Sequence, residues 1–471
     1  MVFFYFYSKK RPPFGKRLPW RDLSGYDGFE ENGTLCFAME RKGSKMVDTN
    51  ERTVLRGLAR QVDELGRLPV MERRRELWRA HNDLERVRPL IAVFPEGSWN
   101  ELLPEESLVC KNEEARSIER DLRSRLYYHT GICDDAVIER TFKVRKLIDG
   151  LPGGTIDLWV DWGVPLRRTE SSASKGAYGF DPVIHTMEDV KKIRTPVLRY
   201  REKETLEQLE RMQDLLGDIL DVRLCGVDYV AFHIMYYYTH MRGLEQMLYD
   251  LYDEPELFHA IVDRLEQGYH SIVDQCEELG LFERNDNGTY QSTGGFGYTS
   301  TLIPPDFDPA HVRPSDLWAC AEAQEMAPVS PDQTEEFCMQ AERRLLRRFG
   351  RNGYACCEPV QDKLPYIRQI HALRRISVSP FADIEACARQ LKDEYIFSWK
   401  CSPFLVCGPV FDEDEIRAYF RKYLPVLKEH GCHVEMILAD THTCHGEPER
   451  FLRWTALARE AIAEVYGCKA D

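Results

Sequence analysis

The sequence lacks the features that would suit it to nucleic acid or to a membrane. Its 63 basic residues are outnumbered by 78 acidic ones, giving a formal net charge of −15, which argues against general binding of polyanions. Long apolar runs are also missing, because the opening MVFFYFY is too short for a signal-peptide core or a transmembrane helix. The chain is therefore expected to bind neither nucleic acid nor a membrane.

Phosphate-binding glycine motifs are missing as well. The one glycine-rich stretch, Gly294-Gly295-Phe296-Gly297, has neither the GxGxxG nor the GxxxxGK spacing, which disfavours a nucleotide-binding fold. The fifteen cysteines follow no regular framework. An odd number of cysteines in a long chain without a secretion signal predicts reduced thiols and a cytoplasmic location.

The chain is long enough, at 471 residues with 43% hydrophobic composition, to bury a large core. Residues 1–45 show no period and are expected to form a poorly ordered extension. Residues 46–165 are assigned to a helical region with the first barrel elements, with Asp48 or Thr49 as the first N-cap and two amphipathic helices over 50–87. Residues 166–471 are assigned to the main barrel, after a Ser/Gly-rich loop at 170–180.

Beyond Val227, short apolar runs alternate with helical segments. Helices are predicted over 242–252 and 255–279 and from Pro331 to Phe349. Strands are predicted near 156, 227, 289, 317, 353, 373, 395 and 432. Such alternation requires a parallel sheet with right-handed crossovers, so the predicted fold class is α/β, a (β/α)8 TIM-type barrel with an N-terminal helical extension. An open doubly wound sheet is the alternative.

Cysteines stand at the ends of two predicted strands. Cys356 and Cys357 end the run GYACC and are followed by Glu358, while Cys444 follows HVEMILAD. The strands of a barrel all end on the face that carries its chemistry, so these thiolates could share one metal ion. Zinc accepts sulfur, nitrogen and oxygen ligands, and either Glu358 or Glu325 could join the thiolates. Which of the adjacent cysteines points inward depends on strand alternation.

Other polar and aromatic side chains near the strand ends are candidates for catalysis and substrate binding. An aromatic wall would suit an apolar or cationic methyl donor. The predicted catalytic residues are His233, Glu325 and His442, and the predicted substrate-binding residues are Tyr236, Gln324, Trp399 and Lys400. The alternative for each is structural, since a cysteine or an aromatic ring is more often part of a core than of a site.

Two segments resemble the uroporphyrinogen decarboxylase superfamily over roughly residues 220–465. They are YDLYDEPELFHAIVDRLEQGYHSIVDQCEELG and the portion from GYACCEPVQDKLPYIRQI to THTCHGEPERFLRWTALARE. Decarboxylases of this superfamily hold substrate carboxylates with arginines near the first strand, where this sequence offers Arg88 alone. Its zinc-dependent methyltransferases use His-x-Cys at one strand end and a distant cysteine, a pattern matched by Cys356 and Cys444, with Tyr354 in the place of the histidine.

The resemblance implies a zinc-dependent methyltransferase that moves a methyl group between a small donor and a separate corrinoid protein. A uroporphyrinogen decarboxylase-type enzyme and a non-catalytic ligand-binding barrel are the alternatives. Asp440 and His442 resemble the start of a corrinoid-binding box, but Gly446 comes one residue too late, and the segment after it is too short for such a module. Cobalamin is therefore expected on a partner protein. The sequence leaves a homodimer open.

Overall fold

The structure is a computed structural model that describes residues 47–169, 179–291 and 293–468. The predicted extension 1–45 and most of the predicted loop 170–180 lie outside these residues. Within the described part of the chain, no helix combines the length and the apolar character needed to cross a membrane.

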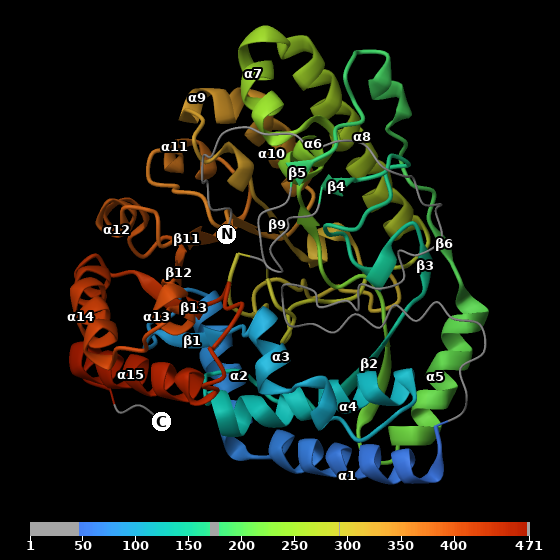
Figure 1. Cartoon of the computed structure of the whole chain (residues 1–471), viewed down its shortest axis with the longest axis vertical. Coiled ribbons are helices and arrows are strands. Elements are labelled where there is room, and N and C mark those ends of the chain that lie inside the picture. Colours follow the sequence, from blue (N-terminus) through green and yellow to red (C-terminus); the bar gives the residue numbers. More distant parts are fainter. Residues whose placement is uncertain (1–46, 170–178, 292, 469–471) are drawn as a thin grey trace, which may run out of the picture.

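Seven strands form the central sheet (Figure 1), in the order β1, β13, β12, β11, β10, β9, β8. Every neighbouring pair is parallel, so the carboxyl ends of all seven strands lie on one side of the sheet. The bounds are Leu90–Val93 (β1), Ala231–Phe232 (β8), Trp318–Ala321 (β9), Arg351–Tyr354 (β10), Leu373–Val378 (β11), Ile396–Lys400 (β12) and His433–Leu438 (β13). The predicted α/β class with a parallel sheet is confirmed.

Strand pairing does not close the sheet within the residues that the structure describes. Ile156 forms one isolated parallel bridge with Val230, the residue that precedes β8. At the other edge two carboxylates border β1: the backbone N–H of Val93 donates to Asp134 (2.9 Å), and that of Ile91 donates to Asp135 (2.8 Å). These carboxylates accept the hydrogen bonds that a further strand would otherwise accept.

Two strand positions differ from the prediction. The run Leu90–Val93 forms β1, as its apolar, strand-like sequence suggests, although it is not among the eight positions assigned to the barrel. The strand predicted near 289 is wrong, since Tyr290 instead forms an antiparallel bridge with Phe296. The chain reverses there through Gly294, whose φ is 134°, and a Cβ at this position would lie 1.9 Å from Ser398 Oγ. Glycine is needed for this close approach.

Helices cover the outer face of the sheet. Trp399 of β12 is fully buried in this layer and its ring stacks on Tyr419 at a centroid distance of 5.4 Å. The inward side chains form a separate apolar cluster that includes Leu90, Cys320 and Tyr290. The covering helices are α6 (Ile234–Arg242), α7 (Leu244–Asp253), α8 (Pro255–Glu278), α10 (Gln340–Leu346), α11 (Leu364–Ile367), α12 (Ile384–Leu391), α13 (Phe404–Cys407), α14 (Glu413–Glu429) and α15 (Glu449–Tyr466).

The helices predicted over 242–252 and 255–279 agree with α7 and α8. The third helix predicted in this half differs from the structure. The segment predicted as one helix from Pro331 to Phe349 consists of α9 (Pro331–Thr334), a π-helical turn (Glu335–Met339) and α10. Such single π turns are frequent near functional sites. This one lies directly before α10, whose Glu342 is fully buried.

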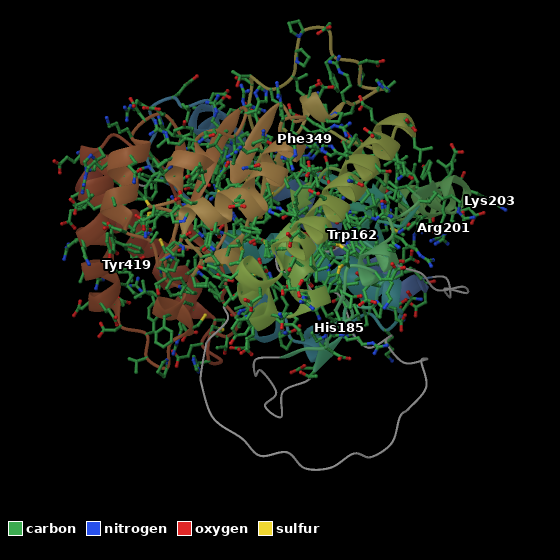
Figure 2. All side chains as sticks on the ribbon, turned by 90° about the horizontal axis from the view of Figure 1, so that it is seen from above. Trp162, His185, Arg201, Lys203, Phe349 and Tyr419 are labelled. Atoms are coloured by element: carbon green, nitrogen blue, oxygen red, sulfur yellow. The ribbon has the colours of Figure 1, made fainter. Side chains whose placement is uncertain are left out.

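The amino-terminal helices form a second packing unit. Of the two predicted N-caps, Asp48 caps the first of them, through a capping box with Glu51. Residues from α5 and β7 complete this unit, although they follow residue 165. Figure 1 shows α1, α4 and α5 together along one edge, and Figure 2 shows Arg201 and Lys203, at the start of α5, opposite Tyr419. The elements are α1 (Thr49–Gly66), α2 (Pro69–Asn82), α4 (Glu113–Tyr127), α5 (Glu202–Leu216), β2 (Thr141–Arg145) and β7 (Asp221–Cys225). The short helix α3 (Trp99–Leu102) packs into the main core instead.

A buried ion pair crosses the inside of the sheet. Arg375 Nε of β11 lies 2.9 Å from Glu435 Oε1 of β13, and both side chains are completely buried. Burial alone would raise the pKa of Glu435, but Arg375 and His81 lower it to about 2. The remaining short strands form antiparallel pairs outside the sheet: β3 (Ile148–Asp149) with β6 (Arg199–Tyr200), and β4 (Arg168–Thr169) with β5 (Gly179–Phe180).

Candidate functional site

The loops after three strands have unusual backbone conformations. Glu96 after β1, Ala355 after β10 and Asp440 after β13 have φ values of 47°, 73° and 58°. A residue other than glycine in this region costs roughly 1–3 kcal/mol, and such residues cluster at functional sites. All three follow the carboxyl ends of their strands, the side on which parallel α/β folds place their chemistry.

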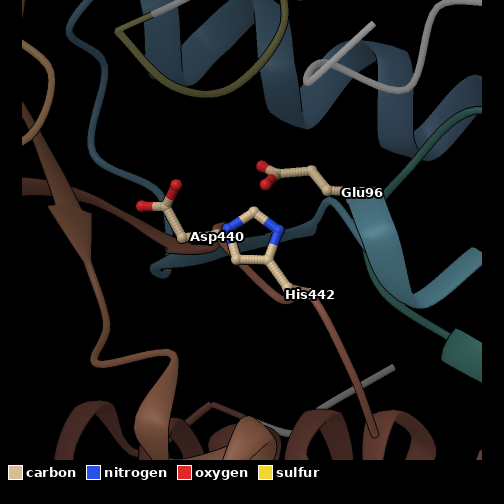
Figure 3. Close-up of side chains that lie close together, drawn as sticks. All are labelled: Glu96, Asp440 and His442. Atoms are coloured by element: carbon tan, nitrogen blue, oxygen red, sulfur yellow. The ribbon is translucent and has the colours of Figure 1, made fainter. Parts of the chain in front are cut away.

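The side chains of Glu96, Asp440 and His442 converge beside β1 and β13 (Figure 3). One potential ligand atom from each residue lies within 4.8 Å of the other two. Glu96 is buried, Asp440 is half-buried and His442 is exposed, so the group opens to solvent on the histidine side. Two carboxylates and one imidazole are common ligands of zinc and of other first-row transition metals.

The two loops that carry this group are joined by hydrogen bonds. Strands β1 and β13 are direct neighbours, with Val93 opposite Leu438. Thr441 Oγ1 donates to the carbonyl oxygens of Phe94 (3.0 Å) and Pro95 (2.9 Å). The backbone N–H of Ser98 donates to the Thr441 carbonyl at 3.0 Å. Residues more than three hundred positions apart are thus held next to each other.

The two adjacent cysteines lie next to this group. Their sulfur atoms are 3.5 Å apart, and Cys357 Sγ lies 3.7 Å from Asp440 Oδ2. The hydrogen bond to Cys357 and then burial raise the pKa of Cys356 well above its usual value. Burial would lower the pKa of Lys400, the last residue of β12, but Tyr290, both thiols and Asp440 raise it overall. Lys400 therefore keeps a positive charge beside the cysteines.

Cys444 lies apart from the cysteine pair, in an environment of its own. Its buried thiol donates to Glu101 Oε2 at 3.1 Å, and the backbone N–H groups of Cys444 and Gly446 donate to the same oxygen. Burial and then Glu101 raise the pKa of Cys444 to about 12. This thiol anchors its loop to α3.

The predicted zinc ligands are therefore not assembled as one set. Among the described residues, Glu96, Asp440 and His442 are the one group of three or more potential ligands within 4.8 Å. Glu358, the other predicted carboxylate near the cysteines, accepts hydrogen bonds from the backbone N–H groups of Cys356 (2.9 Å) and Ala323 (3.2 Å). The hydrogen bonds of each loop determine where its ligands point, and they separate Cys444 from Cys356.

The side chain of His233 lies between the carboxylates of Asp157 and Glu322. The three residues follow neighbouring positions of the sheet. Its Nε2 is 3.0 Å from Asp157 Oδ1 and its Nδ1 is 2.9 Å from Glu322 Oε1. Burial would lower the pKa of His233, but these two hydrogen bonds raise it well above the usual value. The ring is therefore a buried imidazolium with both nitrogens donating, which leaves neither nitrogen available to bind a metal.

Further acids surround this array. Burial and then the charge of Glu322 raise the pKa of Glu325 well above the ordinary value and also raise that of Glu358. The Oε2 atom of Glu325 is buried without a hydrogen-bond partner in the described structure. Burial likewise raises the pKa of Glu342 to about 8, and Tyr354 donates to its carboxylate at 2.7 Å. A protonated Glu325 could donate a hydrogen bond to a bound molecule.

The predicted substrate-binding residues fall in different places. Lys400 lies at the strand ends, and Gln324 is half-buried in the turn after β9, with its backbone N–H donating to Glu322 at 2.9 Å. Tyr236 is buried in α6, with its ring 6.5 Å from that of His233. Trp399 lies in the helix layer, because strand alternation turns it away from the side that Lys400 faces.

The sequence-based prediction missed four residues of the site. They are Glu96, Asp157, Glu322 and Asp440. Glu96, Glu322 and Asp440 each follow a short apolar run, as a residue at the end of a parallel strand should, whereas Asp157 follows the glycine-rich PGGTI, and Asp440 is two positions before the predicted His442. An acidic residue directly after a strand was thus an available signal.

Comparison with known proteins gives little further information. No protein-family model matches this chain, and no curated protein matches it. Among solved structures, a methyltransferase from Methanosarcina mazei is similar at 12% sequence identity and a TM-score of 0.45, over 83% of this chain and 98% of that protein. A likeness this distant carries no information about the side chains of the site.

Proposed function

We propose that this chain is a zinc-dependent methyltransferase that moves a methyl group between a small donor and a separate corrinoid protein. The observation that carries the proposal is the convergence of Glu96, Asp440 and His442 at the carboxyl ends of neighbouring parallel strands. The resemblance of residues 220–465 to the uroporphyrinogen decarboxylase superfamily supports it. The proposal includes the closed (β/α)8 barrel expected from the sequence, in which all strand ends border one mouth.

The donor atoms fit zinc. One imidazole nitrogen and two carboxylate oxygens are accepted zinc ligands, and three protein ligands leave a fourth position for substrate. Cys357 Sγ, 3.7 Å from Asp440 Oδ2, adds a sulfur atom beside the set. When bound, zinc would supply Lewis-acid polarisation of a methyl donor or hold a thiol substrate as its thiolate.

Other residues of the chain would position the donor and supply a proton. Burial favours the protonated form of Glu325, which could donate to the oxygen or nitrogen from which the methyl group departs. His233, fixed by Asp157 and Glu322, would act as a stationary positive charge and not as a base. Lys400 would hold a second positive charge beside the cysteines.

The corrinoid would be presented by a second protein. The described elements make up the parallel sheet, the helices that cover it, the amino-terminal helical unit and the short strand pairs outside the sheet. A corrinoid protein docking at the strand ends would bring its cobalt to the exposed side of His442. A methoxylated aromatic compound or a methylamine is the proposed type of donor.

The decarboxylase alternative fits this site less well. A porphyrinogen carries several carboxylates and would need cations to hold them. Arg88, the candidate from the sequence, lies before β1 and forms an ion pair with Asp135 at 2.8 Å. The strand ends instead carry Asp157 and Glu322, whose negative charge would oppose such a substrate.

Metal analysis of the purified full-length protein tests the proposal. We expect about one zinc per chain, and we expect His442→Ala and Asp440→Asn to lose most of it, because each removes one of three ligands. The matched control is His445→Ala, which changes an exposed histidine of the same loop whose Nε2 contacts the Cys407 carbonyl at 2.8 Å. This control should keep its zinc.

Activity assays then separate the two enzyme classes. The purified protein is offered a reduced corrinoid protein with methoxylated aromatic and methylamine donors, and uroporphyrinogen in a separate reaction. Methylation of the corrinoid that disappears in His442→Ala supports the proposal. Retention of stoichiometric zinc by His442→Ala, or decarboxylation that survives chelation, would show that the proposed centre is not the site of the reaction.

A further inference from the structure

The backbone holds the two adjacent cysteines in one arrangement. The N–H of Cys356 donates to Glu358 Oε2 at 2.9 Å, and Ser377 Oγ of β11 donates to the carbonyl of the same residue at 2.8 Å. The preceding Ala355 has a φ of 73°. With both sides of Cys356 fixed, the two sulfur atoms stay in contact at 3.5 Å.

The two adjacent cysteines are more exposed than Cys444. Cys356 and Cys357 are both half-buried, whereas Cys444 is completely buried and its thiol donates to Glu101. Attack on a disulfide requires an accessible thiol, which favours the half-buried pair over Cys444.

We propose that Cys356 and Cys357 form an oxidisable dithiol that regulates the neighbouring metal centre. The oxidant is a small-molecule disulfide. One cysteine attacks a sulfur of that disulfide, forms a mixed disulfide and releases one small thiol. The second cysteine attacks the protein sulfur of the mixed disulfide and releases the other small thiol. Two electrons and two protons pass from the protein pair to the small disulfide, and one Cys356–Cys357 bond forms.

Such a bond would be easily reversed. Adjacent Cα atoms are about 3.8 Å apart across a trans peptide, whereas the Cα atoms of ordinary disulfides are usually about 4.4–6.8 Å apart. A bond between neighbours is therefore strained, and strained disulfides are the ones that small thiols reduce readily. The pair suits a reversible modification better than a structural link.

Oxidation would act on the metal centre through Asp440. Formation of the disulfide removes the Cys357 hydrogen, so the contact to Asp440 Oδ2 at 3.7 Å loses its donor. Groups that orient a metal ligand typically change metal affinity about 10–100-fold. This consequence rests on the proposed function, because it requires Asp440 to be a ligand. We expect zinc to bind the oxidised protein about tenfold more weakly.

Peptide mapping tests the disulfide itself. Trypsin should release residues 352–363, which contain Cys356 and Cys357 and no other cysteine. After treatment of the full chain with oxidised glutathione, this peptide should lose two hydrogens and resist alkylation, and dithiothreitol should restore both thiols. Cys357→Ser should stop at a glutathione adduct on Cys356, while Cys444→Ser should behave as the wild type does. Free thiols in this peptide after treatment, or a stable adduct in the wild type, would overturn the proposal.

Zinc titration of the reduced and oxidised proteins, by competition with a chromophoric chelator, tests the regulation. Weaker binding by the oxidised protein supports it, and equal affinities would overturn it. If the reduced protein binds no zinc, the proposed function fails, and the regulatory part of this inference fails with it. The peptide map still decides the disulfide independently.

Discussion

Replacing His233 by glutamine should destabilise the protein strongly. The imidazolium donates to Asp157 at 3.0 Å and to Glu322 at 2.9 Å, and all three side chains are buried. A hydrogen bond to a charged group contributes about 1.5–3 kcal/mol. Glutamine keeps a donor but removes the positive charge, which leaves two buried carboxylates without a counter-charge. We expect the free energy of unfolding to fall by about 3–5 kcal/mol near pH 6, as for other broken buried pairs.

The effect should depend on pH in a defined direction. The pKa of His233 is raised in the folded protein, whereas in the unfolded chain it is about 6.5. Its contribution to stability is therefore complete below about pH 6.5 and is lost as the pH rises through the folded pKa. Within that window this histidine lowers the free energy of unfolding of the wild type by about 1.4 kcal/mol per pH unit. The glutamine variant should lack this slope.

Urea unfolding between pH 5.5 and 8.5 measures both quantities. The wild type and His233→Gln should differ most at the acidic end, and the difference should shrink as the pH rises. The control is His445→Gln, an exposed histidine, which should run parallel to the wild type. Equal midpoints for the wild type and His233→Gln at pH 6, or parallel pH dependences, would refute the assignment of His233 as a buried imidazolium.

Two further predictions concern buried polar contacts. Glu435→Gln leaves Arg375 as an uncompensated buried charge, so urea unfolding should show a loss of about 3–5 kcal/mol, and an unchanged midpoint would contradict the buried ion pair. Cys444→Ala removes the thiol that donates to Glu101 and should cost about 1–3 kcal/mol while zinc content stays the same, whereas Cys444→Ser should recover most of the stability. Loss of zinc from Cys444→Ser would show that Cys444 is a zinc ligand, contrary to this prediction.

The sequence was sufficient for much of the secondary structure, because these signals are local. Apolar spacing of three and four residues marked α1, α7 and α8, and Asp48 was identifiable as an N-cap from its position before the first helix. The short apolar runs of β9 to β13, each followed by a helical segment, predicted the parallel sheet. The apolar run Leu90–Val93 also indicated a strand, but not its place in the sheet beside β13.

Residues of the site could be recognised individually but not as partners. His442, His233, Cys356, Cys357 and Lys400 all lie at strand ends, where the predicted topology would place them. Their roles stay predictions. Side chains alternate between the two faces of a strand, and the sequence does not show which set points inward. In the structure, Trp399 points to the outer face, toward the helices.

The tertiary structure alone decided which of these residues meet. Glu96 joins Asp440 and His442 because β1 pairs with β13, a neighbour relation between strands far apart in the sequence. Cys444 lies apart from the cysteine pair because four donors of its loop converge on Glu101. A residue type and its local pattern show what a side chain can do, but its partners depend on strand order and loop hydrogen bonds, which no local pattern encodes.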